Sequence, residues 1–182
     1  DEVEDIIRRL EKFHREVNEE SKRIIEELER VHREVNRKSE EIVRKLEKVL
    51  DEVREKAKRR SRSEEVRKRL EEIADEVRRV KEEVERLNRE NKREVDRLKK
   101  EVEDLNRDNR KKVEEVIKVV EDGKLRAEEV EEVVRRLVRH AEAVVERIER
   151  LVEELVRNAE KLVEEVKRKA DRLVEEADRT VR

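Results

Sequence analysis

The stretch that decides the fold lies between positions 14 and 39 and reads HREVNEESKRIIEELERVHREVNRKS. The pattern HxxxNxxS occurs in it twice, beginning first at His14 and again at His32, an 18-residue interval. Apolar and small residues of the first 57 positions recur in steps of 3, 4, 3, 4 and 4, a cycle with the same 18-residue period. Eighteen residues make five α-helical turns, so the stripe stays on one side of a straight helix, whereas a heptad repeat would impose a supercoil. The stretch therefore predicts a long, nearly straight amphipathic helix.

The same interval continues through two further segments. Equivalent apolar positions are Val66, Val84, Val102 and Val120 in one segment, and Val134, Val152 and Ala170 in the next. The segments are separated near Ser61 and Ser63, either of which can cap a new helix, and at Gly123, which suits the left-handed residue after a helix end. We predict one all-α domain over residues 1–182, with helices at about 2–60, 63–121 and 125–181. Because both connections are short, neighbouring helices are expected to run antiparallel, in an up-down-up bundle.

The composition argues against several classes of function. Charged residues make up 58% of the chain, against roughly 25% in an average globular protein, but the 52 basic and 54 acidic residues are interspersed and the net charge is −2. Nucleic acids and anionic membranes need a basic face, so neither is an expected partner. No apolar run approaches the ~20 residues of a membrane span. The chain has no cysteine, and so no thiolate nucleophile and no disulfide.

Polar residues interrupt the apolar stripes of all three predicted helices. Folding the two hairpins about their loops brings these residues to the same two heights, which predicts two buried polar networks. Network 1 contains His14, Asn18, Ser21, Asn106, Asn109 and His140, and network 2 contains His32, Asn36, Ser39, Asn88, Asn91 and Asn158. A buried amide or imidazole without partners costs about 1–3 kcal/mol. We therefore expect each set to be connected by hydrogen bonds, which would penalise every other register of the helices.

At the end of the bundle beside the first loop, apolar residues replace the polar pattern. Leu50 stands where a third histidine would be, and Leu70 and Ile73 stand where third asparagines would be. Arg54 and Ala57 occupy the remaining equivalent positions. The sequence predicts an apolar clamp at this end.

The polar residues also invite chemical interpretations. Each set has at most two histidines and neither a cysteine nor a core carboxylate, and amides and hydroxyls are poor zinc ligands, so no metal or other cofactor is expected. His14 and Ser21 lie two helical turns apart on one helix, without a core acid or an oxyanion-hole loop, so no enzymatic activity is expected. A pH switch stays open, because protonating a buried histidine turns an acceptor into a second donor.

These features together resemble de novo designed helical bundles with modular buried hydrogen-bond networks. The shared features are uniform helix lengths, duplicated His/Asn/Ser layers, a core of Val, Ile, Leu and Ala, a charged surface, and the loop Asp122-Gly123-Lys124. The likeness covers all 182 residues, which include no Pro, Cys, Met, Trp or Tyr. The resemblance implies a synthetic, soluble protein without a natural compartment, cytoplasmic on recombinant expression. Members of the class serve as oligomers, halves of heterodimers, switches or scaffolds.

The widths of the apolar faces bear on partners. At 100° per residue, the core residues span about 140° on the first helix, about 120° on the second and about 160° on the third. Ile7, Ile25 and Val43 widen the first face, and the excess is expected to line a groove between the first and third helices. We expect a structural module that associates through this groove with itself or with a designed partner helix or bundle. The alternative is a monomeric three-helix rod or scaffold without a partner, and neither function involves a small-molecule substrate.

Overall fold

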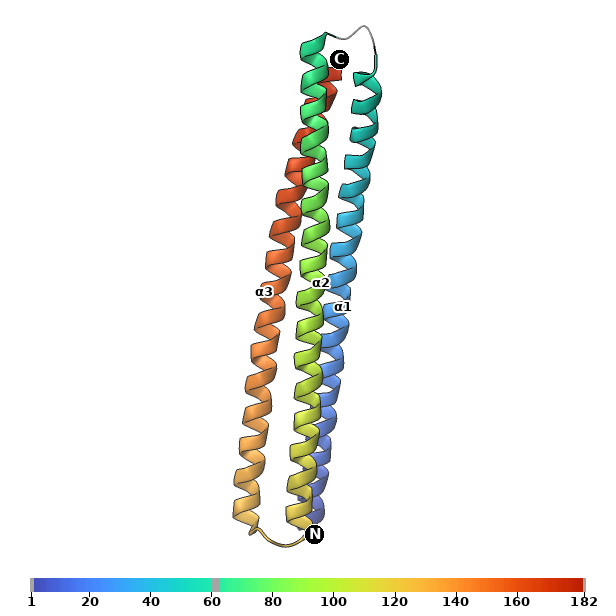
Figure 1. Ribbon diagram of the computed structural model, residues 1–182. Coiled ribbons are helices and arrows are strands. Elements are labelled where there is room, and N and C mark those ends of the chain that lie inside the picture. The colour runs from blue at the N-terminus through green and yellow to red at the C-terminus, as the bar shows by residue number, and fades with distance from the viewer. Residues whose placement is uncertain (1, 60–62, 182) are drawn as a thin grey trace. The chain divides into compact units, whose positions relative to one another are not determined.

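A computed structural model of the chain describes residues 2–59 and 63–181. These ranges form three helices and contain no strand. They are α1 (Glu2–Ala57), α2 (Glu64–Glu121) and α3 (Ala127–Val181), labelled in Figure 1. The prediction of an all-α three-helix bundle is confirmed. The predicted helix bounds differ from the observed ones by at most a few residues, mainly at the end of α1 and the start of α3.

Two local motifs set the bounds of α2. At its start, the backbone N–H of Val66 donates to Ser63 Oγ at 3.3 Å, so Ser63 caps the helix, while Ser61 lies outside the described residues. At its end, Gly123 adopts φ +66°. The N–H of Gly123 donates to the Val120 carbonyl at 3.1 Å, and that of Lys124 to the Val119 carbonyl at 3.3 Å, the pair of bonds that defines a Schellman motif. The predicted role of Gly123 is confirmed.

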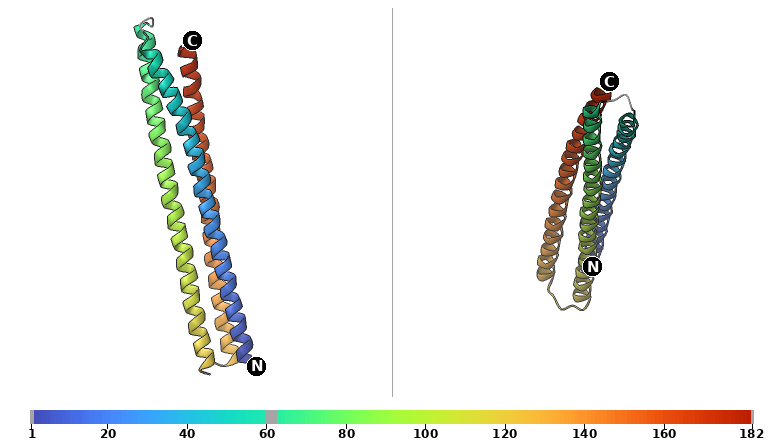
Figure 2. Two further views of the ribbon diagram at one scale, coloured as in Figure 1. Left: turned by 90° about the vertical axis from the view of Figure 1, so that its right-hand side faces the viewer. Right: turned by 45° about the horizontal axis from the view of Figure 1, so that its top comes forward.

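The contacts divide the chain into two compact units, each with a stretch of all three helices. Unit 1 consists of Asp1–Arg30 and Val95–Glu154, and unit 2 of Val31–Glu94 and Leu155–Arg182. In Figures 1 and 2, the blue, yellow and orange parts of the ribbon belong to unit 1, and the light blue, green and red parts to unit 2. The two units correspond to the two polar sets of the sequence.

In unit 1, interhelical contacts give the direction of each helix. Asn18 of α1 bonds Asn106 of α2, and Glu29 further along α1 pairs with Lys99, which is earlier in α2, so these helices are antiparallel. Arg9 and Arg23 of α1 pair with Glu131 and Glu149 of α3 in the same order, so α1 and α3 are parallel. One apolar cluster of this unit consists of Ile6, Leu10, Val113, Val120, Val130 and Leu137.

Unit 2 holds the larger apolar cluster, which extends from Val35 and Leu87 to the first loop. Leu70 and Ile73 are fully buried in it, and Leu50 is only 8% exposed. Ala57 packs against the same cluster, whereas Arg54 is exposed. The predicted apolar clamp is confirmed.

Candidate functional site

The centre of the polar layer in unit 1 is a hydrogen bond between two asparagines. Asn106 Nδ2 of α2 donates to Asn18 Oδ1 of α1 at 3.1 Å, and both side chains are half-buried. Both lie on the sides of their helices that face each other, because the 18-residue repeat keeps them in step with the apolar stripe. The structure thus brings together two members of the predicted network 1 from different helices.

Unit 2 repeats this arrangement at the equivalent positions. Asn88 Nδ2 donates to Asn36 Oδ1 at 3.0 Å, again between α2 and α1. Asn36 Nδ2 in turn donates to Glu40 Oε1 at 3.3 Å on its own helix. The same pair recurs at nearly the same distance, one repeat further along α1 and one repeat earlier in α2, so the asparagine bridge is a repeated unit of construction.

The serines of the two sets do not link helices. Ser21 is 4% exposed and its Oγ donates to the Val17 carbonyl at 2.8 Å, one turn back on α1. Its equivalent Ser39 is 5% exposed, and its Oγ has no hydrogen-bond partner among the described residues. The serines act here as small, buried spacers within α1.

The most deeply buried polar side chains of α2 are the second asparagines of each set. Asn109 is 2% exposed and Asn91 is 7% exposed. Within residues 2–59 and 63–181, neither side-chain amide has a hydrogen-bond partner, and the same holds for the buried Nδ1 atoms of His14 and His32. A buried polar group without a partner costs about 1–3 kcal/mol. The expectation that hydrogen bonds connect each set is therefore wrong for these four side-chain groups, which lie in the polar layers outside the asparagine bridges.

The expectation that α3 contributes polar core residues is wrong. His140 and Asn158 are both exposed, and the residues that α3 turns to the core at these heights are Ala141 and Ala159, 2% and 6% exposed. Consecutive helical residues point about 100° apart, so an error of one position moves a side chain from core to surface. Alanine at these positions turns only a methyl group to the core. The signal was present in the sequence, since Ala141, Ala159 and Ala177 themselves follow the 18-residue interval.

The placement of the widened face of α1 also needs correction. Val43 lines a hollow of about 270 Å³ between α1 and α2, together with Asn36, Ser39, Val84 and Asn88. It does not line the groove with α3, as we expected, because it lies on the side of α1 that carries the asparagine. Val43, which widens the apolar face of α1, therefore lies beside the asparagine bridge of unit 2.

A groove does exist between α1 and α3 in unit 1, with a volume of about 550 Å³. We call it the acidic groove. Its apolar residues are Phe13 and Val17 of α1 and Val134, Val138, Ala141 and Val145 of α3, and its charged residues are Arg9, Lys12, Glu16, Glu20, Glu142, Glu146 and Glu149. Four of the apolar side chains (Phe13, Val134, Val138 and Val145) are only half-buried.

Ion pairs between α1 and α3 bracket the acidic groove. At one end Arg9 Nη1 donates to Glu131 Oε1 at 2.8 Å, and this bond lowers the pKa of Glu131. At the other end Arg23 donates to Glu20 of its own helix and to Glu149 Oε1 at 2.7 Å. The bond from Arg23 lowers the pKa of Glu20, whereas a hydrogen bond to Glu20 and partial desolvation raise the pKa of Glu149. Two carboxylates thus share one guanidinium at this end.

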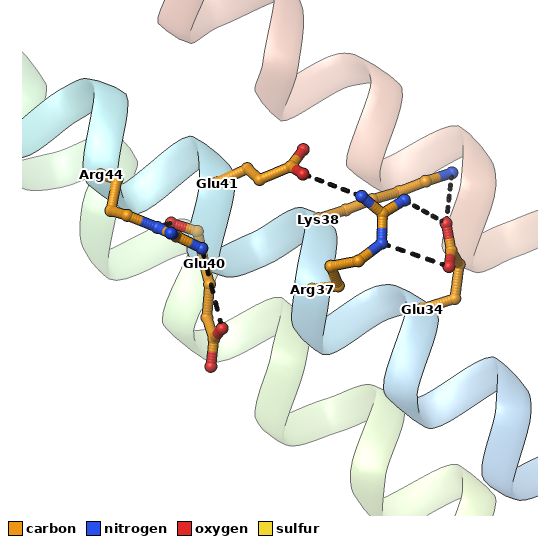
Figure 3. A network of polar contacts seen from close by, with 6 residues as sticks. All are labelled: Glu34, Arg37, Lys38, Glu40, Glu41 and Arg44. Carbon is orange, nitrogen blue, oxygen red and sulfur yellow. Dashed lines mark hydrogen bonds and ion pairs between the residues drawn. The ribbon is translucent and has the colours of Figure 1, made fainter.

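The equivalent groove of unit 2 has a volume of about 480 Å³ and different walls. Its apolar lining is reduced to Ile42 and Val163. Figure 3 shows the α1 wall, where Arg37 donates to Glu34 at 2.6 Å and to Glu41 at 2.8 Å. The bond to Arg37 lowers the pKa of Glu34. The charges of this wall are largely satisfied along α1 itself.

The described ranges contain no group of three or more His, Cys, Asp or Glu residues that could hold a metal ion. Among the same residues, no helix is apolar over a sufficient length to cross a membrane.

Comparisons with known proteins give no relative for this chain. No family model, no curated protein and no solved structure matches it.

Proposed function

We propose that the chain is a structural association module, in which the paired asparagines of α1 and α2 fix the register of helix pairing and the acidic groove receives a partner. The observation that carries this proposal is the duplicated asparagine bridge, 3.1 Å long in unit 1 and 3.0 Å long in unit 2. An asparagine pair between helices adds less stability than an apolar pair, but most displaced registers separate its two members, so it favours one arrangement.

The proposal includes a synthetic origin without a natural biochemical activity. The strict 18-residue repeat, the polar layers duplicated at that interval and the absence of Pro, Cys, Met, Trp and Tyr support it, as the resemblance to designed bundles implies. Such a protein is expected to be soluble in the cytoplasm of an expression host.

The alternative is a monomeric scaffold without a partner. It is favoured by the extent of burial within one chain, since Val3 and Leu162 are the only large apolar side chains that are exposed among those the structure describes. Sedimentation equilibrium over a wide range of concentrations tests self-association. A single species with the mass of one chain would exclude self-association and leave either a separately supplied partner helix or the monomeric scaffold.

The role of the asparagines is tested by replacing Asn18 and Asn106 with leucine in the full chain. We expect unfolding to require more denaturant, while amide NMR spectra change from one set of resonances to several, because the pair no longer excludes displaced registers. A single, fully dispersed set of resonances in the leucine variant would contradict the role in register and favour the scaffold. Unfolding by denaturant checks that the variant is folded under the conditions of the NMR measurement.

A further inference from the structure

The acidic groove of unit 1 is long enough to hold one α-helix of a partner. Its α3 wall extends from Val134 to Glu149, which is about 24 Å at 1.5 Å per residue, or between four and five helical turns. Four half-buried apolar side chains, Phe13 among them, form its floor. An amphipathic helix binds such a groove by placing a stripe of residues at i, i+3, i+4 and i+7 on the floor.

The walls of this groove determine which flanks that helix needs. Five glutamates line it against two basic residues, and one of the two, Arg9, already donates to Glu131. Within the described part of the chain, Glu16, Glu142 and Glu146 form no ion pair. At the far end, Glu20 and Glu149 share Arg23, and the hydrogen bond to Glu20 raises the pKa of Glu149. Glu16, Glu142 and Glu146 can therefore pair with the cationic side chains of a bound partner.

Unit 2 shows that part of this charge pattern does not follow the repeat, although Glu16, Glu142 and Glu146 recur there as glutamates. The core positions recur at the 18-residue interval, yet the surface charges of α1 are inverted between units 1 and 2 at six equivalent positions. The pairs are Glu19 and Arg37, Glu20 and Lys38, Lys22 and Glu40, Arg23 and Glu41, Glu26 and Arg44, and Glu27 and Lys45. On α3, Glu149 is likewise replaced by Lys167. Two equivalent grooves thus carry different charges on a repeated core, the arrangement that discriminates between partners by charge.

We propose that the acidic groove of unit 1 binds an amphipathic helix of a separate partner, with an apolar stripe flanked on both sides by lysine or arginine. The inference rests on the proposed function and adds the chemistry of the partner to it. Charge complementarity selects this occupant over a second copy of the chain, whose surface carries interspersed charges of both signs rather than a basic flank. The apolar stripe supplies most of the affinity, and the basic flanks supply the selectivity.

The test measures binding of two synthetic helical peptides to the full chain by fluorescence anisotropy. Each peptide has about three heptads with leucine at positions a and d. One peptide has lysine at positions e and g, and the other has glutamate there. We expect the lysine peptide to bind about ten-fold more tightly at low ionic strength, and the preference to shrink when salt is raised above about 0.5 M. Equal affinities, or tighter binding of the glutamate peptide, would overturn the proposed partner chemistry.

Matched variants locate the site. Exposed Glu142 and Glu146 are equivalent to Glu160 and Glu164 of unit 2, which line the groove of that unit. We expect the double variant E142K/E146K to lose the preference for the lysine peptide and E160K/E164K, with the same change of charge, to retain it. An equal loss in both would show that net charge, not this groove, attracts the peptide.

A third variant separates failure of the partner chemistry from failure of the association function. Val138→Asp places a charge on the groove floor, and we expect it to weaken both peptides at least ten-fold with helicity by circular dichroism unchanged. If both peptides bind wild type equally and V138D abolishes both, the groove binds helices without regard to charge, and only the partner chemistry is wrong. If neither peptide binds wild type, the partner helix is wrong, and sedimentation then decides between a second copy and the monomeric scaffold.

Discussion

Unit 2 contains the same helix positions twice, once polar and once apolar, and the two layers differ in how well they are satisfied. In the polar layer, Asn88 bonds Asn36 at 3.0 Å while the buried amide of Asn91 has no partner in the described residues. One repeat earlier in α2, Leu70 and Ile73 occupy the equivalent positions and are fully buried. The backbone is helical at both pairs of positions, so the two layers differ in their side chains.

This comparison separates stability from specificity. Burying leucine or isoleucine contributes about 1.5–3 kcal/mol per side chain, whereas an asparagine in the same place is favourable only if its amide finds partners. The apolar layer therefore stabilises the unit in any register that keeps apolar residues together. An asparagine bridge forms only where one asparagine meets another, so the polar layer contributes to the choice of register more than to stability.

The largest expected effect comes from making the apolar layer polar. Ile73→Asn removes a fully buried side chain and leaves an amide among apolar neighbours, so we expect a loss of about 4 kcal/mol in the free energy of unfolding. Urea-induced unfolding followed by circular dichroism measures it. Glu71→Asn, an exposed change in the same helix turn, controls for helix propensity and should cost at most about 0.7 kcal/mol. Similar losses in the two variants would show that the layers do not differ.

The reverse exchange is expected to stabilise the protein. Leucine has nearly the shape of asparagine, so Asn91→Leu removes an amide without hydrogen bonds and fills the same space. We expect a gain of about 1–3 kcal/mol in urea unfolding, and a gain of the same sign for Asn109→Leu in unit 1. A loss of stability in both variants would mean that these amides are satisfied in solution.

A smaller effect isolates the asparagine bridge itself. A double-mutant cycle with Asn36→Ala and Asn88→Ala should give a coupling free energy of about 1 kcal/mol, the net value of one hydrogen bond. The same cycle on Asn18 and Asn106 should agree within about 0.5 kcal/mol, because the two bridges have nearly the same length. A coupling free energy in only one of the two units would show that the two asparagine bridges are not equivalent.

The smallest effect extends the comparison to the groove walls, where Glu149 and Lys167 are equivalent. The fold raises the pKa of Glu149, chiefly through its hydrogen bond to Glu20, so ionising it disfavours the folded state. This cost is fully present above the raised pKa, declines as the pH falls through it, and vanishes below the pKa of the unfolded chain. Glu149→Gln should therefore raise stability at pH 7 by at most about 0.5 kcal/mol, because the side chain is 40% exposed to screening water. The gain should disappear near pH 4 in thermal melts.

Lys167→Gln is the control for this pH effect. This change removes no carboxylate from the groove walls, so the difference in stability between this variant and wild type should stay constant from about pH 4 to pH 7. A constant difference for Glu149→Gln as well would contradict the raised pKa.

The fold was predictable because one strong signal repeats throughout the sequence. The 18-residue interval fixes the stripe of every helix, and Ser63 and Gly123 mark two of the ends. The asparagine bridges followed from the same interval, since helical register places Asn18 near Asn106 and Asn36 near Asn88 once the hairpins are folded.

The two errors concern the side of a helix on which a residue lies, and this side changes by about 100° from one residue to the next. A polar residue within an apolar stripe, such as His140, is conspicuous in a sequence, whereas a small residue at the same interval, such as Ala141, is not. Val43 is a second case, because it lies on the side of α1 that carries Asn36 rather than on the side toward α3. Sequence periodicity gives the centre of an apolar face well, but which neighbour takes each edge depends on the packing of all three helices.

The apolar layer at the first loop also resolves an ambiguity that a perfect repeat would create. Two identical polar layers cannot, by themselves, distinguish the native alignment from one displaced by five turns, because one asparagine pair would still meet another. With Leu70 and Ile73 at the third position, such a slide brings the polar segment of α1 against leucine and isoleucine and strands its asparagine. The apolar layer therefore leaves the native alignment of α1 and α2 as the only one of these repeated alignments in which both asparagines of α1 meet an asparagine of α2.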